Sequence, residues 1–91
     1  MTKPHVIVYS RPGCHLCDDM KALVAAVIRR HRFDATVDEV DISRDASLES
    51  LYGEEIPVLL VDGRKIAKYR ITEAELLRAL NARPGGAGAA G

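Results

Sequence analysis

Residues 9–17 have the sequence Tyr9-Ser10-Arg11-Pro12-Gly13-Cys14-His15-Leu16-Cys17, and at Cys14 a strand pattern changes into a helix pattern. The run His5–Ser10 is apolar and rich in β-branched residues, which is typical of a buried, parallel strand. Arg11-Pro12-Gly13 then supplies a turn. From Cys14 to about His31 the apolar residues recur with a helical period, which predicts an amphipathic helix that packs on a sheet.

Two further elements are expected in the middle of the chain. Ala35–Ile42 predicts a second strand, and its charged residues favour a place at the edge of the sheet. Because a helix joins the first two strands in a crossover, these strands must be parallel. Asp45–Tyr52 predicts a short helix, with Gly53 as a left-handed stop.

The last part of the chain predicts a hairpin followed by a helix. Ile56–Val61 is a second apolar run that predicts a buried strand. Asp62-Gly63 supplies a tight turn into a returning strand over Arg64–Tyr69. Thr72 and Glu75 have the spacing of a capping box, which marks the start of the last helix.

The predicted order of elements is therefore β-α-β-α-β-β-α, which belongs to the α/β class. It corresponds to a mixed four-stranded sheet flanked by helices, with Val6–Tyr9 and Val58–Val61 in its centre. One domain over residues 1–82 accounts for all of these elements, since a chain of 91 residues leaves no room for a second domain. The glycine- and alanine-rich residues 83–91 are expected to form a disordered tail.

The composition argues against several classes of function. The chain has a formal net charge of zero and only 4% aromatic residues, so neither a basic patch nor a stacking platform for nucleic acid is expected. No stretch approaches the roughly 20 apolar residues that a bilayer span needs, and no signal-peptide pattern precedes the first strand. We expect a cytoplasmic protein that binds neither nucleic acid nor membrane.

The two cysteines, Cys14 and Cys17, are the candidate catalytic residues. Cys14 stands where a loop after a strand becomes a helix, and the free N–H groups and positive pole of that helix favour a thiolate, the form that attacks disulfides. Cys17 lies one turn later on the same face, near enough to close a disulfide, and belongs to the buried stripe of the helix. We expect Cys14 to attack a substrate disulfide and Cys17 to resolve the mixed disulfide.

Charged neighbours modify this expectation. Asp18 and Asp19 disfavour a nearby thiolate, and Arg11 in the preceding loop is expected to offset their charge. Activation of Cys14 should therefore be moderate. A protonated His15 would stabilise the thiolate, whereas a solvent-exposed histidine with little effect explains the same residue equally well.

Two other uses of the cysteines stay open. A pair of cysteines supplies half of a zinc site, and the histidines lie inside the motif or at distant element ends, so a zinc site within one chain is not expected. An iron–sulfur cluster held between two subunits through the Cys14 thiolate is one alternative. A redox-inert adaptor that keeps the fold for protein contacts is the other.

Residues 9–17 resemble the strand, loop and active-site segment of the glutaredoxins, and Ile56-Pro57-Val58 resembles the cis-proline loop of the thioredoxin superfamily. The resemblance covers about residues 5–82 and is strongest to the small glutaredoxin-like proteins with a C-x-L-C motif. It implies a thioredoxin-like fold and a cis bond between Ile56 and Pro57 that faces the active site. The Ile56 backbone would then pair with an extended substrate, as an added strand does.

The sequence departs from the glutathione-using glutaredoxins at two places. Glu55-Ile56-Pro57 replaces their Thr-Val-Pro segment, and Ala67–Glu73 lacks their glycine pair. Arg11, Arg70 and the start of the last helix are candidates to hold a substrate carboxylate, against the alternative of solvated basic residues. Glutathione or another low-molecular-weight thiol is therefore a candidate co-substrate, and no resident cofactor or metal is expected.

The sequence thus predicts a monomeric thiol–disulfide oxidoreductase that reduces protein or low-molecular-weight thiol disulfides through a C-x-x-C dithiol cycle. Its expected partners are disulfide-containing proteins and a thiol reductant or reductase. The predicted catalytic residues are Cys14 and Cys17, and the predicted substrate-binding residues are Arg11, His15, Ile56 and Pro57.

Overall fold

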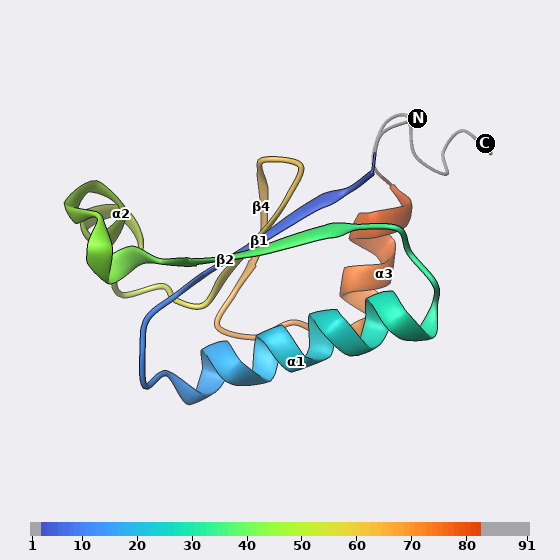
Figure 1. The fold of residues 1–91 in the computed structure, drawn as a ribbon, viewed down its shortest axis with the longest axis horizontal. Helices are drawn as coiled ribbons and strands as arrows, with labels where there is room; N and C mark the ends of the chain where they lie inside the picture. The colour runs from blue at the N-terminus through green and yellow to red at the C-terminus, as the bar shows by residue number, and fades with distance from the viewer. Residues whose placement is uncertain (1–2, 83–91) are drawn as a thin grey trace.

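The computed structural model describes residues 3–82, so the tail predicted over residues 83–91 lies outside the described part, as do residues 1 and 2. The elements follow the predicted order, with one short 3-10 helix after the second strand (Figure 1). They are β1 (His5–Ser10), α1 (His15–Arg30), β2 (Thr36–Asp41), η1 (Ile42–Arg44), α2 (Ala46–Tyr52), β3 (Val58–Val61), β4 (Arg64–Lys68) and α3 (Glu73–Asn81).

The four strands form one mixed sheet in the order β2-β1-β3-β4. β1 pairs in parallel with β2 and antiparallel with β3, while β3 and β4 form the antiparallel hairpin. The two apolar strands therefore occupy the centre, and the charged strand β2 lies at an edge, as predicted. The mixed four-stranded α/β fold is confirmed.

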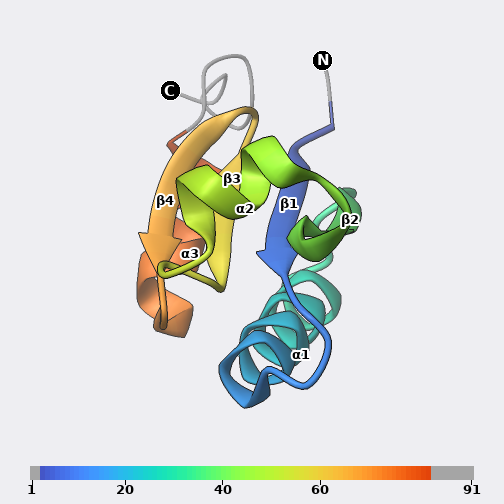
Figure 2. The same ribbon diagram turned by 90° about the vertical axis from the view of Figure 1, so that its left-hand side faces the viewer.

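The core lies between the sheet and two helices on one of its faces. Figures 1 and 2 show α1 and α3 on the same side of the sheet. Val6 and Val8 of β1 are fully buried in this layer together with Leu76 of α3. The buried stripe of α1 includes Cys17 and Met20, so the packing of the core sets the direction in which Cys17 faces.

Two local signals are confirmed. Asp62 and Gly63 have φ values of 51° and 83°, as a two-residue hairpin turn requires. The Glu75 N–H donates to Thr72 Oγ1 at 3.1 Å, and the Thr72 N–H donates to Glu75 Oε1 at 2.9 Å. This reciprocal capping box starts α3 at Glu73, directly after its cap.

Two expectations about the middle of the chain were wrong. The strand predicted from Ile56 begins only at Val58, because Pro57 has no N–H to donate to the sheet. Gly53 follows α2 with φ −53° and ψ −30°, in the right-handed helical region and not in the left-handed one. A Cβ at Gly53 would lie 2.6 Å from the Glu49 carbonyl oxygen, so close packing, and not backbone handedness, favours glycine at this position.

Candidate active site

The cysteine motif opens α1 at the end of the molecule where β1 and β2 finish (Figure 1). Cys14 is the N-cap of α1, and the Cys17 N–H donates to its Sγ at 3.1 Å. A disulfide joins the two cysteines, whose Cα atoms lie 5.2 Å apart, within the usual range for such bonds. The pairing and the start of the helix are thus as the spacing predicted.

The two sulfurs have different environments. Cys17 is 1% exposed and faces the core, whereas Cys14 is partly exposed at the end of the helix. The free N–H groups of the first helical turn and the positive end of the helix dipole lie at Cys14, and they stabilise negative charge there. One sulfur of the pair is therefore accessible at the start of the helix, and the other is shielded by the core.

The Ile56–Pro57 peptide bond is cis, as the resemblance implied. β1 and β3 are antiparallel with Tyr9 opposite Val58, so the loop that leaves β1 and the loop that enters β3 meet at the same end of the sheet. Pro57 is buried, and within residues 3–82 neither the N–H nor the carbonyl of Ile56 makes a hydrogen bond. An unpaired peptide group therefore lies at the same sheet end as the cysteine loop.

The Arg11 side chain does not offset the acidic residues of α1, contrary to the expectation above. Its guanidinium forms an ion pair with the Glu49 carboxylate and donates to the Gly53 carbonyl oxygen at 3.4 Å. The physical reason is that α2 brings Glu49 to the cysteine loop, where it balances the arginine charge. Arg11 thus ties this loop to α2.

Lys21 balances the first of the two acidic residues instead. Its Nζ lies 3.5 Å from Asp18 Oδ1 and donates to Glu39 Oε2 at 2.8 Å. These contacts, above all the hydrogen bond to Glu39, raise the pKa of Lys21 above its ordinary value. Asp19 and His15 are exposed, and their side chains make no hydrogen bond or ion pair within the described part of the chain.

A hydrogen-bonded network at the end of β1 was not predicted from the sequence. Ser10 is 2% exposed, and its hydroxyl donates to Glu39 Oε2 at 2.7 Å. The hydrogen bond from Lys21, followed by the one from Ser10, lowers the pKa of Glu39. The network joins β1, β2 and α1 where the chain enters the cysteine loop. No local pattern marks it, since Ser10 and Glu39 are 29 positions apart.

Tyr69 is a second residue that sequence reasoning missed. β4 ends at Lys68, one residue earlier than predicted, because Tyr69 has a positive φ of 69°. The Tyr69 N–H donates to the Pro57 carbonyl oxygen at 2.8 Å, and its hydroxyl donates to the Glu54 carbonyl oxygen at 2.8 Å. Tyr69 therefore holds the loop before β3 at both of its ends.

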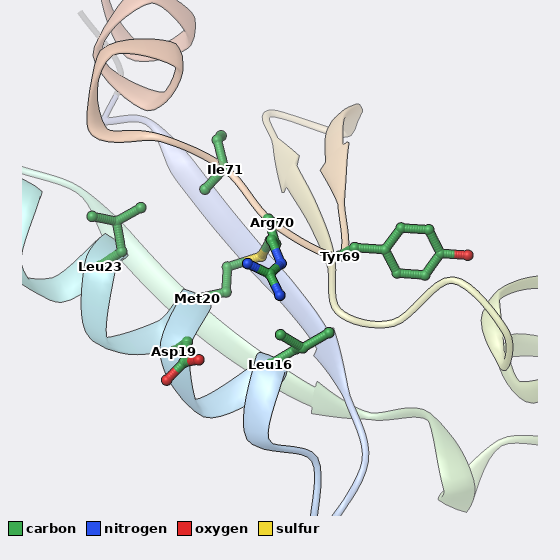
Figure 3. A pocket seen from close by; sticks show the side chains of 7 residues that line it. All are labelled: Leu16, Asp19, Met20, Leu23, Tyr69, Arg70 and Ile71. Carbon is green, nitrogen blue, oxygen red and sulfur yellow. The ribbon is translucent and has the colours of Figure 1, made fainter.

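A cavity of about 190 Å³ adjoins the cysteine motif (Figure 3). One wall belongs to α1 and includes Leu16, one of the two residues between the cysteines, and the other wall belongs to the segment between β4 and α3. The lining residues are Leu16, Asp19, Met20, Leu23, Tyr69, Arg70 and Ile71.

Neither a metal site nor a membrane span is found among residues 3–82. No three histidine, cysteine, aspartate or glutamate side chains in this range are grouped as ligands for a metal ion. No helix in this range is both long enough and apolar enough to cross a membrane.

Three known proteins illustrate what this chain is similar to. A glutaredoxin-like protein of Dictyostelium discoideum, described as a YDR286C homolog, is 30% identical over 74 residues, which cover 75% of this chain and 67% of that protein. The X-ray structure of protein XcR50 from X. campestris is 32% identical, with a TM-score of 0.67 over 87% of this chain and 99% of that one. A thioredoxin from Halobacterium salinarum, 20% identical, has a TM-score of 0.64 over 89% of this chain and 74% of its own.

These similarities agree with the geometry of the site. The likeness to the thioredoxin shows a thioredoxin-like fold, and the cis-proline loop and the cysteine pair occupy the same end of the sheet. The family model described as Glutaredoxin-like domain (DUF836) matches residues 5–81, and the chain belongs to this glutaredoxin-like family.

Proposed function

We propose that the chain is a thiol–disulfide oxidoreductase in which Cys14 is the attacking sulfur and Cys17 the resolving one. The observation that carries the proposal is that the two disulfide-bonded cysteines differ in their exposure to solvent. Cys14 caps α1 and is partly exposed, while its partner Cys17 is 1% exposed. Membership of a glutaredoxin-like family supports a redox-type function for such a pair.

The proposed cycle begins with the reduced pair. The Cys14 thiolate attacks one sulfur of the substrate disulfide, forms a mixed disulfide and expels the other substrate sulfur as a thiolate, which takes up a proton. The Cys17 thiol then gives its proton to solvent, and its sulfur attacks Cys14 Sγ. This breaks the mixed disulfide and releases the second substrate sulfur, which is also protonated. The substrate has gained two electrons and two protons, and the cysteine pair has become a disulfide.

The proposed substrates are disulfides in proteins or in low-molecular-weight thiols. A protein substrate would bind as an extended segment whose backbone pairs with the unbonded N–H and carbonyl of Ile56. The buried Pro57 sets the direction of this peptide group, and His15 at the helix start stabilises the thiolate when it is protonated. Arg11 supports the site indirectly, because its ion pair with Glu49 ties the cysteine loop to α2. Glutathione, another small thiol or a reductase would return the oxidised pair to the dithiol form.

The proposal is tested by equilibrating the purified protein in thiol–disulfide buffers of defined potential. Free thiols are trapped by alkylation, and the intact mass reports how many were present. We expect a reversible conversion of Cys14 and Cys17 with a midpoint between roughly −270 and −180 mV. A pair that forms no disulfide in oxidising buffer, or thiols that react only after a metal is removed, would contradict the proposal. Those results would favour the adaptor or the cluster-binding alternative.

Single substitutions separate the roles of the two cysteines. Cys17→Ser keeps the attacking sulfur and is expected to accumulate a mixed disulfide with bis(2-hydroxyethyl) disulfide, seen as a mass increase on Cys14. Cys14→Ser is the matched variant and is expected to accumulate none, because Cys17 is 1% exposed. Adducts on Cys17 at the same rate would show that the assigned order of attack is wrong.

A further inference from the structure

The cavity beside the cysteine motif has an apolar floor (Figure 3). Leu16, which lies between the two cysteines, lines it from α1 together with Met20, which is 3% exposed. Ile71, which packs against the core, lines it from the segment before α3. The volume of about 190 Å³ is of the size of one large side chain. An apolar side chain entering the cavity would exchange water for aliphatic contacts.

Two charged side chains of opposite sign stand on the two walls of this cavity. Figure 3 shows Asp19 on α1 and Arg70 on the segment after β4. Within residues 3–82 neither side chain makes a hydrogen bond or an ion pair. The cavity therefore offers a guanidinium on one side, where a carboxylate would be bound. On the other side it offers a carboxylate, which would repel a second acid.

The backbone fixes the position of Arg70 relative to the proline loop. The Arg70 N–H donates to the Lys68 carbonyl oxygen at 2.8 Å, across Tyr69 with its positive φ, which closes a γ-turn. The N–H of Tyr69 itself is bonded to the Pro57 carbonyl. Arg70 therefore follows directly on Tyr69, the residue that is bonded to the proline loop, and these hydrogen bonds place the Arg70 wall of the cavity next to that loop.

We infer that this cavity is a specificity pocket for protein disulfides. The preferred substrate carries an apolar side chain near its attacked cysteine, which enters the cavity, and beside it an acidic residue, which pairs with Arg70. The inference rests on the proposed function and names its substrate class. An extended peptide fits these observations better than a small thiol does, because Tyr69, which lines the cavity, is hydrogen-bonded to Pro57, the neighbour of the unpaired Ile56 backbone. Main-chain pairing would supply affinity, and the pocket would supply specificity.

The test measures second-order rate constants for the reduced protein with two short peptides. Each peptide carries one cysteine as a mixed disulfide with 2-mercaptoethanol, a leucine near that cysteine, and beside the leucine either glutamate or lysine. We expect the glutamate peptide to react about fivefold faster, the upper end for an exposed ion pair. Replacing the leucine of the glutamate peptide with glycine should slow its reaction by a similar factor. Equal rates for the glutamate and lysine peptides would overturn the inference.

Three variants assign the preference to the pocket. Arg70→Gln should abolish it, and Asp19→Asn should increase it, two opposite changes that a loss of folding would not produce. Arg64→Gln is the matched control, since Arg64 is an exposed residue at the hairpin end of β4. A control that lowers the preference as much as Arg70→Gln does would overturn the inference.

Two small disulfides separate the remaining outcomes. Bis(2-hydroxyethyl) disulfide has no group for the pocket, so its rate with each variant reports the reactivity of Cys14 alone, and the peptide rates of that variant are divided by it. A wild-type protein that fails to reduce it contradicts the proposed function itself. Glutathione disulfide tests for a small-thiol site at the same place. A rate with glutathione disulfide that Arg70→Gln lowers more than the peptide rate would overturn the assignment to protein substrates.

Discussion

Replacing Ser10 with alanine tests the network that joins β1, β2 and α1 beside the cysteine loop. The variant removes the hydrogen bond from Ser10 Oγ to Glu39 Oε2 at 2.7 Å and leaves the one from Lys21 in place. A hydrogen bond to a charged group contributes about 1.5–3 kcal/mol. The Glu39 side chain is 48% exposed, so water replaces part of this contribution. We expect the free energy of unfolding to fall by about 1 kcal/mol at neutral pH, which lowers the Tm by about 4–8 °C.

The expected loss depends on pH because Ser10 donates to the ionised form of Glu39. The hydrogen bonds from Lys21 and Ser10 lower the pKa of Glu39 in the folded protein. The stability that these bonds contribute is fully present above the pKa that Glu39 has in the unfolded chain. It is lost as the pH falls through the lower pKa that Glu39 has in the folded protein. Thermal unfolding followed by circular dichroism should therefore show a Tm difference that is largest near neutral pH. The difference should shrink once the pH falls below about 4.3, the ordinary pKa of a glutamate.

Ser50→Ala provides the matched control for this experiment. Ser50 is exposed, and its side chain makes no hydrogen bond within residues 3–82, so its replacement should change the free energy of unfolding by less than about 0.5 kcal/mol. A Tm difference for Ser10→Ala that stays the same from neutral to acidic pH would refute the claim that Ser10 stabilises the ionised form of Glu39. A difference no larger than that of the control would show that the network does not stabilise the fold.

Three further variants test other parts of the structure. Tyr69→Phe removes only the hydroxyl that donates to the proline loop, so urea unfolding should show a loss of about 0.5–1 kcal/mol; an unchanged midpoint would mean that water replaces this bond fully. Leu76→Ala removes a fully buried side chain and should lower the free energy of unfolding by about 2–5 kcal/mol, a large part of what a small domain has, and a loss below about 1 kcal/mol would contradict the assignment of Leu76 to the core. Glu73→Gln removes a carboxylate whose pKa is lowered by hydrogen bonds from His31 and Arg30. Its Tm deficit should fade as the pH falls through the folded pKa of Glu73, and a deficit independent of pH would count against this pairing.

Several elements of the fold could be predicted because their signals are local. The apolar runs that became β1 and β3, the helical period after Cys14 and the capping box at Thr72 each involve residues a few positions apart. The turn at Asp62-Gly63 is set by the backbone conformations that these two residues adopt easily. The order of strands then followed from burial, since two strands without charged residues belong in the centre of a sheet.

The cysteine pair could also be predicted, for a related reason. Cys14 and Cys17 lie one helical turn apart, so their spacing alone brings the sulfurs together at a helix start. The cis bond before Pro57 is different, because an ordinary trans proline fits the same local sequence, and only the family resemblance pointed to it.

The amino-acid sequence by itself therefore determined the elements, the sheet order and the cysteine pair, all of which depend on backbone hydrogen bonding and on the burial of periodic apolar residues. Only the tertiary structure decided the partners of the polar side chains. Arg11 pairs with Glu49, and Ser10 pairs with Glu39, across separations of 38 and 29 positions. Such pairs depend on the register between strands and on where a helix end comes to lie, which the charges of the individual residues do not specify. The pocket beside the motif has the same origin, since the turn at Tyr69 places Arg70 on the wall of the cavity opposite α1.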